Sequence, residues 1–133
     1  MRMKKLALAC ALALGLQAPS LAQWKPAGDR IKTEWGEKLD PANVLPEYPR
    51  PMERKEWKNL NGLWDYAIRP CGEAEPKTYD GEILVPFAVE SSLSGVGVHL
   101  EDSQELWYTR QFEVPAGWKG KRVLLHFGAV DWR

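Results

Sequence analysis

The sequence predicts an all-β fold built of layered sheets, and three observations support this class. Apolar and polar residues alternate with a period of two in residues 64–69 and 106–114, a pattern typical of strands with one buried face. Turn-forming residues separate such runs at short intervals, as in sandwiches and barrels. Beyond residue 22 there is no sustained helical period.

The first 22 residues have the layout of a secretory signal peptide. Basic residues at the start are followed by a short apolar run over residues 6–16, and small residues precede Gln23. The run is shorter than the roughly 20 residues that cross a bilayer. We therefore expect an exported protein, periplasmic or secreted, that has no membrane contact once residues 1–22 are removed.

The composition argues against several partners and bonds. Eighteen basic residues balance eighteen acidic ones without a long cluster of either sign, which argues against a nucleic-acid partner. Cys10 falls within the signal, so Cys71 is expected to have no internal disulfide partner. The seven tryptophans are either packed in a sandwich core or stacked on sugar rings. The sequence predicts no particular oligomeric state.

Residues 23–54 are expected to form an extended lead-in rather than packed structure. Prolines recur along them, and each removes an amide donor and disfavours helix at the preceding residue. A short helical turn can form between Asp29 and Lys38, where Ile31 and Trp35 are four residues apart.

The domain proper spans residues 55–133, and its first two strands follow turn signals. An Asn-Gly turn precedes the first, in which Trp64, Tyr66 and Ile68 share one face. Residues 82–87 contain an unbroken Ile-Leu-Val run, which predicts a second strand covered on both sides.

Two further strands are expected, over residues 106–114 and 121–131. Val123, Leu125 and Phe127 would share a face of the last one. Four strands do not close a sandwich of two sheets, and the last would be left with unpaired edges. We therefore expect the chain to be the front part of a longer protein, in preference to a domain completed by a partner.

Motifs for metal or nucleophilic chemistry are weak or absent. His99 and His126 lie in different predicted elements, and Cys71 has no partner at ligand spacing, so no metal site and no cofactor are predicted. The glycines around Val96 lack the third glycine and the helix of a phosphate loop. Nucleophilic catalysis would need a positioned base beside one of the loop serines, and none is indicated. These serines are Ser91, Ser92 and Ser94.

Paired carboxylates are the remaining possibility, within the connection formed by residues 88–105. Retaining glycoside hydrolysis needs two carboxyls roughly 5 to 5.5 Å apart, and loop acids are mostly solvated. We predict no catalytic residue in this chain. The acids considered are Glu90, Glu101, Asp102 and Glu105.

Four motifs, taken in order, resemble the N-terminal sugar-binding domain of glycoside hydrolase family 2. They are Trp-Lys-Asn-Leu-Asn-Gly-Leu-Trp-Asp-Tyr at 57–66, Val-Pro-Phe to Ser-Gly at 85–95, Leu-Trp-Tyr-Thr-Arg-Gln-Phe at 106–112, and Leu-His-Phe-Gly-Ala-Val-Asp-Trp at 125–132. The resemblance covers about residues 48–133. It implies a jelly-roll, galactose-binding-like β-sandwich, incomplete at its C-terminal side, from a family that contains β-galactosidases, β-glucuronidases and β-mannosidases.

In that family the glutamates of a retaining mechanism lie in a later barrel domain, so the chain alone is expected to be inactive towards β-glycosides. Some β-galactosidases reach into the site with a Ser-Asn-Trp sequence after the Val-Pro pair. This chain has Phe87-Ala88-Val89 there, which leaves Glu90 as the nearest polar candidate for a substrate contact. The expected partner is then a carbohydrate, a β-glycoside.

Two alternatives from other classes remain open. The chain could be a free-standing carbohydrate-binding module, with exposed tryptophans such as Trp107 or Trp118 as stacking platforms. It could instead be a non-catalytic scaffold whose open sheet edge receives a partner strand.

Overall fold

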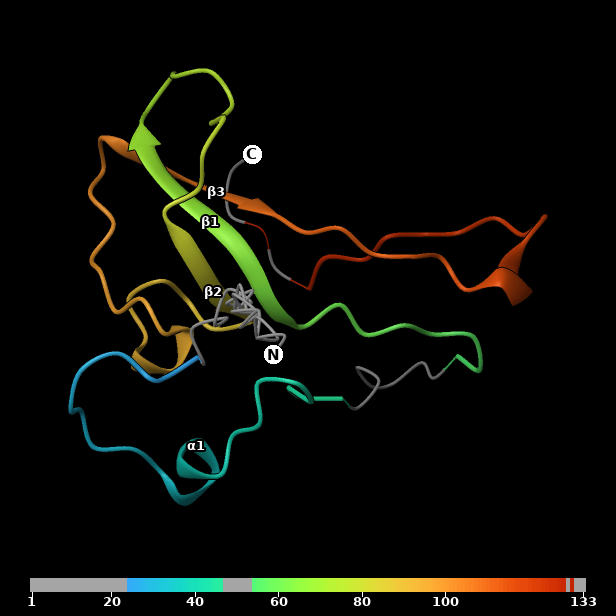
Figure 1. Cartoon of the computed structure of the whole chain (residues 1–133), viewed down its shortest axis with the longest axis horizontal. Coiled ribbons are helices and arrows are strands. Elements are labelled where there is room, and N and C mark those ends of the chain that lie inside the picture. The colour runs from blue at the N-terminus through green and yellow to red at the C-terminus, as the bar shows by residue number, and fades with distance from the viewer. Residues whose placement is uncertain (1–23, 47–53, 129, 131–133) are drawn as a thin grey trace, which may run out of the picture.

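The computed structural model describes residues 24–46, 54–128 and 130, and three strands dominate it. They form one antiparallel sheet in the order β2-β1-β3, so β1 lies at the centre (Figure 1). The all-β class is thus confirmed, and the small open sheet is consistent with part of a larger β-structure. The elements are α1 (Glu34–Glu37), β1 (Gly62–Pro70), β2 (Gly81–Val85), η1 (Ser92–Ser94), β3 (Gln104–Thr109) and η2 (Ala116–Trp118).

Several sequence predictions fall on residues outside these ranges. The signal peptide with Cys10, part of the proline-rich lead-in (47–53), and residues 129 and 131–133 are among the positions that the structure does not describe. Within the described ranges, no helix is long and apolar enough to cross a membrane.

The register of the sheet decides which side chains share a face. Leu63 lies opposite Leu84, and Trp64 lies opposite Ile83. Opposed residues of an antiparallel pair project to the same side. Ile83 and Leu84, both fully buried, therefore point to opposite faces. Strand β2 is covered on both sides, as its unbroken apolar run predicted.

The first predicted strand is also present, but its most buried residue lies on the other face. Ala67 is fully buried, whereas Trp64, Tyr66 and Ile68 are only half-buried. A small side chain at position 67 lets Trp107 pack across it from the opposite position on β3. Both faces of β1 are consequently in contact with other parts of the domain.

In its described part, residues 24–46 and 54, the lead-in is irregular apart from one helical turn, and the expectation that it is not packed is wrong there. Val44 is buried in the core at 2% exposure. The amide of Asn59 donates to the carbonyls of Val44 and Leu45 at 3.1 and 3.0 Å, and that of Asn61 reaches the Val44 carbonyl at 3.3 Å. Amide side chains just before β1 therefore tie the lead-in to the sheet.

The possible helical turn in the lead-in is present as α1. Thr33 caps it, because its hydroxyl accepts the Gly36 N–H at 3.2 Å. The two residues that suggested the turn are not buried: Ile31 is fully exposed and Trp35 is 81% exposed. Spacing alone identified the turn but not the side that faces solvent.

The prediction of a strand over residues 121–131 is wrong for its described part. Residues 121–128 are irregular, and Val123, Leu125 and Phe127 are 45%, 55% and 62% exposed. The strand over 106–114 is also shorter than predicted, since β3 ends at Thr109. A strand requires a hydrogen-bonded neighbour, and no described segment forms a ladder with these residues.

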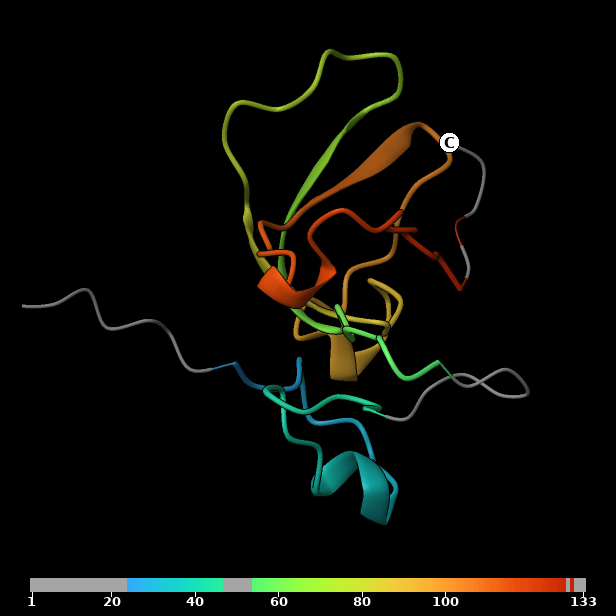
Figure 2. The same ribbon diagram turned by 90° about the vertical axis from the view of Figure 1, so that its right-hand side faces the viewer.

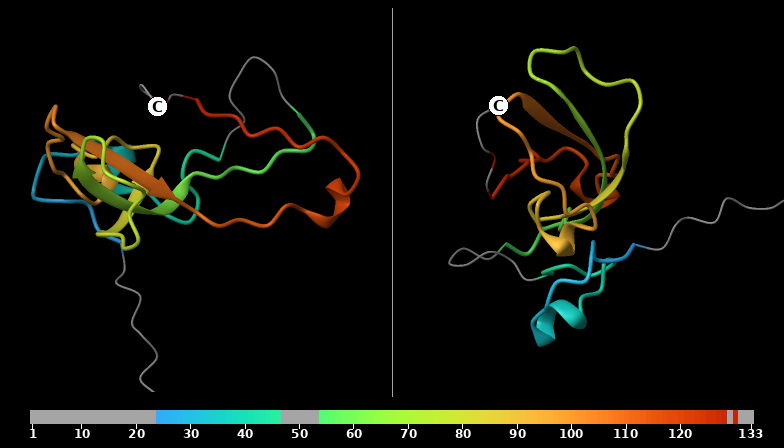
Figure 3. Two further views of the ribbon diagram at one scale, coloured as in Figure 1. Left: turned by 90° about the horizontal axis from the view of Figure 1, so that it is seen from above. Right: turned by 90° about the vertical axis from the view of Figure 1, so that its left-hand side faces the viewer.

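Residues 110–128 instead form an arm that projects from the sheet (Figure 1; Figure 3, left). We call this segment the apolar arm, after the exposed side chains it carries. Lys58 donates to the Glu113 carbonyl at 2.7 Å, and Lys121 forms an ion pair with Glu56. Polar contacts with the segment before β1 thus hold both legs of the arm.

Asp80 closes the connection between β1 and β2. Its carboxylate accepts the Ile68 N–H at 2.9 Å and the Arg69 guanidinium at 2.8 and 2.9 Å. The hydrogen bond from Ile68, followed by that from Arg69, holds the pKa of Asp80 below its ordinary value. The charged form of Asp80 therefore stabilises this end of the sheet.

Asp80→Asn is expected to lower the free energy of unfolding by about 1 kcal/mol at pH 7, the modest value reflecting a partly exposed carboxylate. Because folding lowers the pKa of Asp80, its contribution to the free energy of unfolding is fully present above the unfolded-state pKa of about 3.9. This contribution is lost as the pH falls through the lower, folded-state pKa. Urea denaturation across this pH range measures it. Asp29→Asn, at an exposed site, serves as the control, and an equal loss in both variants would contradict the assignment.

Candidate functional site

The candidate site lies in the long connection between β2 and β3, which begins with a cis Val85-Pro86 bond. The loop is closed by a hydrogen bond from the Val98 N–H to the Val89 carbonyl at 3.2 Å. Within it, the Ser91 hydroxyl caps η1 by accepting the Leu93 N–H at 3.2 Å. Gly95 ends η1 at φ +84°, a conformation that favours glycine.

Ser94 is the buried centre of this loop. Its hydroxyl accepts the N–H groups of Val96 and Gly97 at 3.0 and 3.4 Å. It also lies within hydrogen-bonding distance of the Ser91 and Val89 carbonyls, at 2.8 and 3.2 Å. One fully buried hydroxyl therefore fixes backbone groups on both sides of η1.

Glu90, the one substrate contact predicted from the sequence, is half-buried at the start of this loop. Its Oε1 accepts the Leu100 N–H at 3.4 Å, which aims the carboxylate towards the return of the loop. An ionised carboxylate has two oxygens that can each accept more than one hydrogen bond, so the bond to Oε1 leaves further acceptor capacity. The carboxylate thus has a structural contact and remains able to accept hydrogen bonds from a ligand.

Tyr108 of β3 lies near enough to Glu90 for the charge of Glu90 to act on its phenol. Burial, and then the negative charge of Glu90, raise the pKa of the Tyr108 phenol above its ordinary value. The phenol therefore keeps its proton at neutral pH and can donate a hydrogen bond. Since 42% of Tyr108 is exposed, a ligand can reach it. Glu90 and Tyr108 together present an acceptor and a donor, which we call the Glu90–Tyr108 pair.

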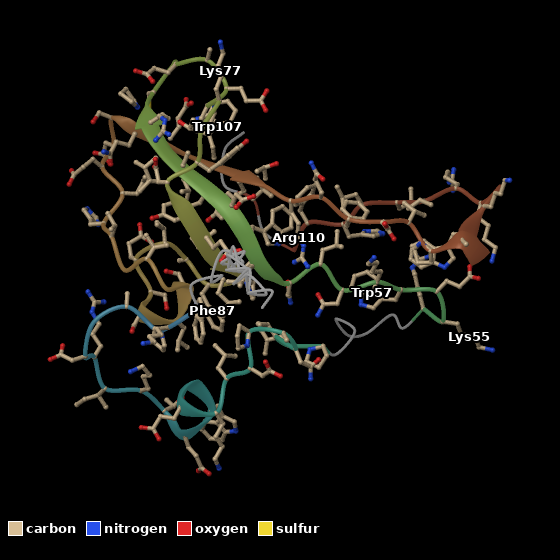
Figure 4. All side chains as sticks on the ribbon, viewed as in Figure 1. Lys55, Trp57, Lys77, Phe87, Trp107 and Arg110 are labelled. Atoms are coloured by element: carbon tan, nitrogen blue, oxygen red, sulfur yellow. The ribbon has the colours of Figure 1, made fainter. Side chains whose placement is uncertain are left out.

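Arg110, directly after β3, has a structural role beside this face of the sheet (Figure 4). Its guanidinium donates to the carbonyls of Leu60 and Asn61 at 2.6 and 3.0 Å. It also lies 5.9 Å from the centre of the Trp64 ring, within the range of a cation–π contact. Arg110 therefore joins the end of β3 to the turn before β1.

The other acids considered from the sequence are not gathered around Glu90. Glu101 and Asp102 are exposed in the turn before β3. Glu105 lies opposite Arg69, on the face of the sheet away from Tyr108, and its Oε1 accepts the Gly72 N–H at 3.4 Å. The arrangement gives no support to a catalytic carboxylate pair in this loop.

The serines and histidines considered from the sequence likewise give no support to a catalytic or metal-binding role in the described part of the chain. The hydroxyls of Ser91 and Ser94 are engaged within the loop, and that of Ser92 donates to the Ala27 carbonyl. His99 and His126 are both exposed. Across residues 24–46, 54–128 and 130, no three His, Cys, Asp or Glu side chains are grouped so that they could hold a metal ion.

The two tryptophans considered as stacking platforms are both half-buried. Trp107 packs across Ala67, and its indole N–H is buried without a hydrogen-bond partner within the described ranges (Figure 4). Trp118 lies in η2, at the tip of the apolar arm. Trp35, which the sequence did not single out as a platform, is far more exposed.

Sequence reasoning proposed Glu90 as a substrate contact but gave no indication that Tyr108 lies near it. Tyr108 was recognised only as one of the alternating residues of a strand, because the approach of the loop to β3 is a tertiary contact. The signal that the sequence offered was the phenolic hydroxyl of Tyr108, a polar group on a largely apolar side chain.

Comparison with known proteins finds similarity to a curated enzyme. A β-glucuronidase of Paenibacillus borealis is 26% identical over 89 residues, covering 62% of this chain and 15% of the relative. The similarity is to a glycosidase. The similarity is distant. This chain spans only about 15% of the length of this relative. No family model matches the chain.

Proposed function

We propose that this chain is the N-terminal sugar-binding domain of an exported retaining β-glycosidase whose catalytic barrel lies outside this sequence. The similarity to a β-glucuronidase supports this proposal, as do the all-β fold and the four ordered motifs. The domain forms one wall of the substrate cleft in this account, and the chain alone hydrolyses nothing.

The Glu90–Tyr108 pair is the part of the domain that contacts the sugar. A carboxylate accepts hydrogen bonds from sugar hydroxyls, and a protonated phenol donates one, so together they suit a polyhydroxylated ring. The exposed ring of Tyr108 adds an aromatic surface for the CH groups of the sugar. The observation that carries the proposal is the half-buried Glu90 carboxylate, held by the Leu100 N–H, in a loop of the same domain as the partly exposed Tyr108 ring.

A neutral glycoside fits this pair better than an anionic one. The carboxylate of a glucuronide would lie near the negative charge of Glu90, which is unfavourable. We therefore favour a β-galactoside over a β-glucuronide as the ligand of this surface. Side-by-side titration of methyl β-galactoside and methyl β-glucuronide tests the order.

Glu90→Gln is expected to weaken the binding of methyl β-galactoside by about tenfold, because a hydrogen bond to a charged group becomes one to a neutral amide. Isothermal titration of the chain measures the affinity. Glu101→Gln, at an exposed acid near the end of the same connection, is the control and should bind like the unmodified chain. Equal losses in both variants, or no effect of Glu90→Gln, would contradict the role of Glu90.

A second candidate function is a scaffold that receives a partner strand. The specific observation in its favour is the apolar arm, where Leu124, Leu125 and Phe127 are 53%, 55% and 62% exposed. An exposed apolar segment that has no sheet partner among the described residues can pair with a strand of another chain. Such a scaffold would show no affinity for glycosides, so the titration above separates the two candidates.

A further inference from the structure

The segment that follows the predicted signal peptide packs against the loop that carries Glu90 (Figures 1 and 2). Ala27 and Ser92 are 65 residues apart in sequence and are joined by two hydrogen bonds. The Ala27 N–H donates to the Ser92 carbonyl at 2.8 Å, and the Ser92 hydroxyl donates to the Ala27 carbonyl. This reciprocal pairing fixes the separation and the orientation of the two segments.

Two glycines of the loop provide the space into which this segment fits. A Cβ atom at Gly95 would lie 2.7 Å from Nε1 of Trp24, and one at Gly97 would lie 2.8 Å from Cβ of Ala27. Both distances are shorter than side-chain contacts allow. Residues other than glycine at these positions would therefore push the N-terminal segment away from the loop.

Trp24 is held in this position by packing rather than by polar contacts. Its indole N–H is buried and has no hydrogen-bond partner within the described part of the chain. Burial of an unpaired donor is unfavourable, so the contact of the ring with Gly95 must offset it. The packing of Trp24 against Gly95, despite its unpaired indole N–H, indicates a specific position for this side chain.

The docked segment is connected directly to Glu90. Arg30 reaches the Glu90 carbonyl at 3.5 Å, and Ser91, the next residue, caps η1. Ser92, which pairs with Ala27, is the first residue of η1, and Gly95 ends it. A shift of η1 would consequently move the backbone that carries the Glu90 side chain.

We propose that residues 24–27 act as a clip that holds η1 in place and thereby positions Glu90, whose carboxylate accepts the Leu100 N–H. Gly95 and Gly97 are the receiving positions of the clip, and Trp24 is its anchor. Glu90 is the binding residue, and the clip acts only through it. The consequence for sugar binding rests on the function proposed above, whereas the positioning of Glu90 does not.

Gly95→Ala tests the clip through a readout that needs no ligand. With ¹³C-labelled tyrosine, NMR titration follows each phenol, and Tyr108→Phe assigns the signal of Tyr108. Displacement of Glu90 in Gly95→Ala should lower the pKa of Tyr108 towards the ordinary value of 10.0. Glu90→Gln removes the charge without moving the loop. It therefore shows how far the pKa of Tyr108 falls when only the charge is lost.

Gly72→Ala is a matched control for backbone strain. Gly72 has φ +82°, almost the same as Gly95, but a Cβ there would meet nothing within 4 Å. The pKa of Tyr108 should be unchanged in this variant. If Gly72→Ala lowers it as much as Gly95→Ala does, strain rather than the clip is responsible and the proposal is overturned.

Trp24→Ala provides a second variant that leaves the loop sequence intact, so that a folding defect of Gly95→Ala does not decide the outcome. It should lower the pKa of Tyr108 in the same direction and weaken methyl β-galactoside binding. An unchanged Tyr108 in folded Trp24→Ala would overturn the clip. If the pKa moves in Trp24→Ala but the unmodified chain binds no glycoside, the clip stands and the proposed sugar-binding function fails.

Discussion

Replacing Leu84 with alanine is expected to lower the free energy of unfolding by about 3 kcal/mol, the largest effect of any single truncation considered. Leu84 is fully buried on β2, opposite Leu63 of the central strand. Its truncation removes apolar contacts and leaves a cavity that β2, an edge strand, can only partly close. Urea denaturation of the variant and the unmodified chain measures the difference.

Leu124→Ala is the matched control for this substitution. Leu124 lies on the apolar arm and is 53% exposed, so the same truncation should change the free energy of unfolding by less than about 0.5 kcal/mol. Comparable losses at positions 84 and 124 would mean that the arm is as well packed as the sheet, in conflict with the structure.

The second large effect is expected at Ser94, where alanine should cost about 2 kcal/mol. The substitution leaves the Val96 N–H without its acceptor and removes the hydroxyl that joins the two sides of η1. Denaturation gives the loss in stability, and hydrogen exchange at the Val96 amide should accelerate. Because the loop also carries Glu90, glycoside affinity should fall as well.

Ser103→Ala controls for the loss of a serine hydroxyl. Ser103 is exposed, and only its backbone carbonyl has a described role, as the acceptor of the Cys71 N–H at 2.8 Å. This variant should be close to neutral. A Ser94→Ala variant that is equally stable and exchanges its Val96 amide at the original rate would show that the hydroxyl does not organise the loop.

The sequence was sufficient to predict local features set by pattern. The unbroken run at Ile83 and Leu84 predicted a strand covered on both faces, and the structure confirms it. The alternation around Tyr66 predicted the central strand. These patterns are reliable because each face of a strand has one environment along its length, which fixes the type of residue at every second position.

Contacts between distant segments were not predictable in the same way. Val44 gave no sign of its burial, nor of the hydrogen bonds that its carbonyl accepts from amides 15 and 17 residues further along the chain. Residues 121–128 have the pattern of a strand, yet no described neighbour hydrogen-bonds with them in a sheet. Pattern identifies the capacity to form a strand, whereas the ladder requires a partner.

At the candidate site, too, local features could be predicted from the sequence, whereas contacts between distant segments could not. Glu90 could be selected because it is the first polar residue after Val89 in a long loop. Its neighbour Tyr108 and the docked residues of the clip follow only from the folded loop. The glycines at 95 and 97 leave space for Trp24 and Ala27, a role that only the packed structure shows.

The most direct test of the central claim, that the Glu90-bearing loop binds a β-glycoside, is an NMR titration of the isotope-labelled chain with methyl β-galactoside. The Leu100 amide, which donates to Glu90, and the ring of Tyr108 should shift together and saturate, while the Val123 amide on the apolar arm should not. Absence of any saturable shift, or shifts confined to the arm, would contradict the account.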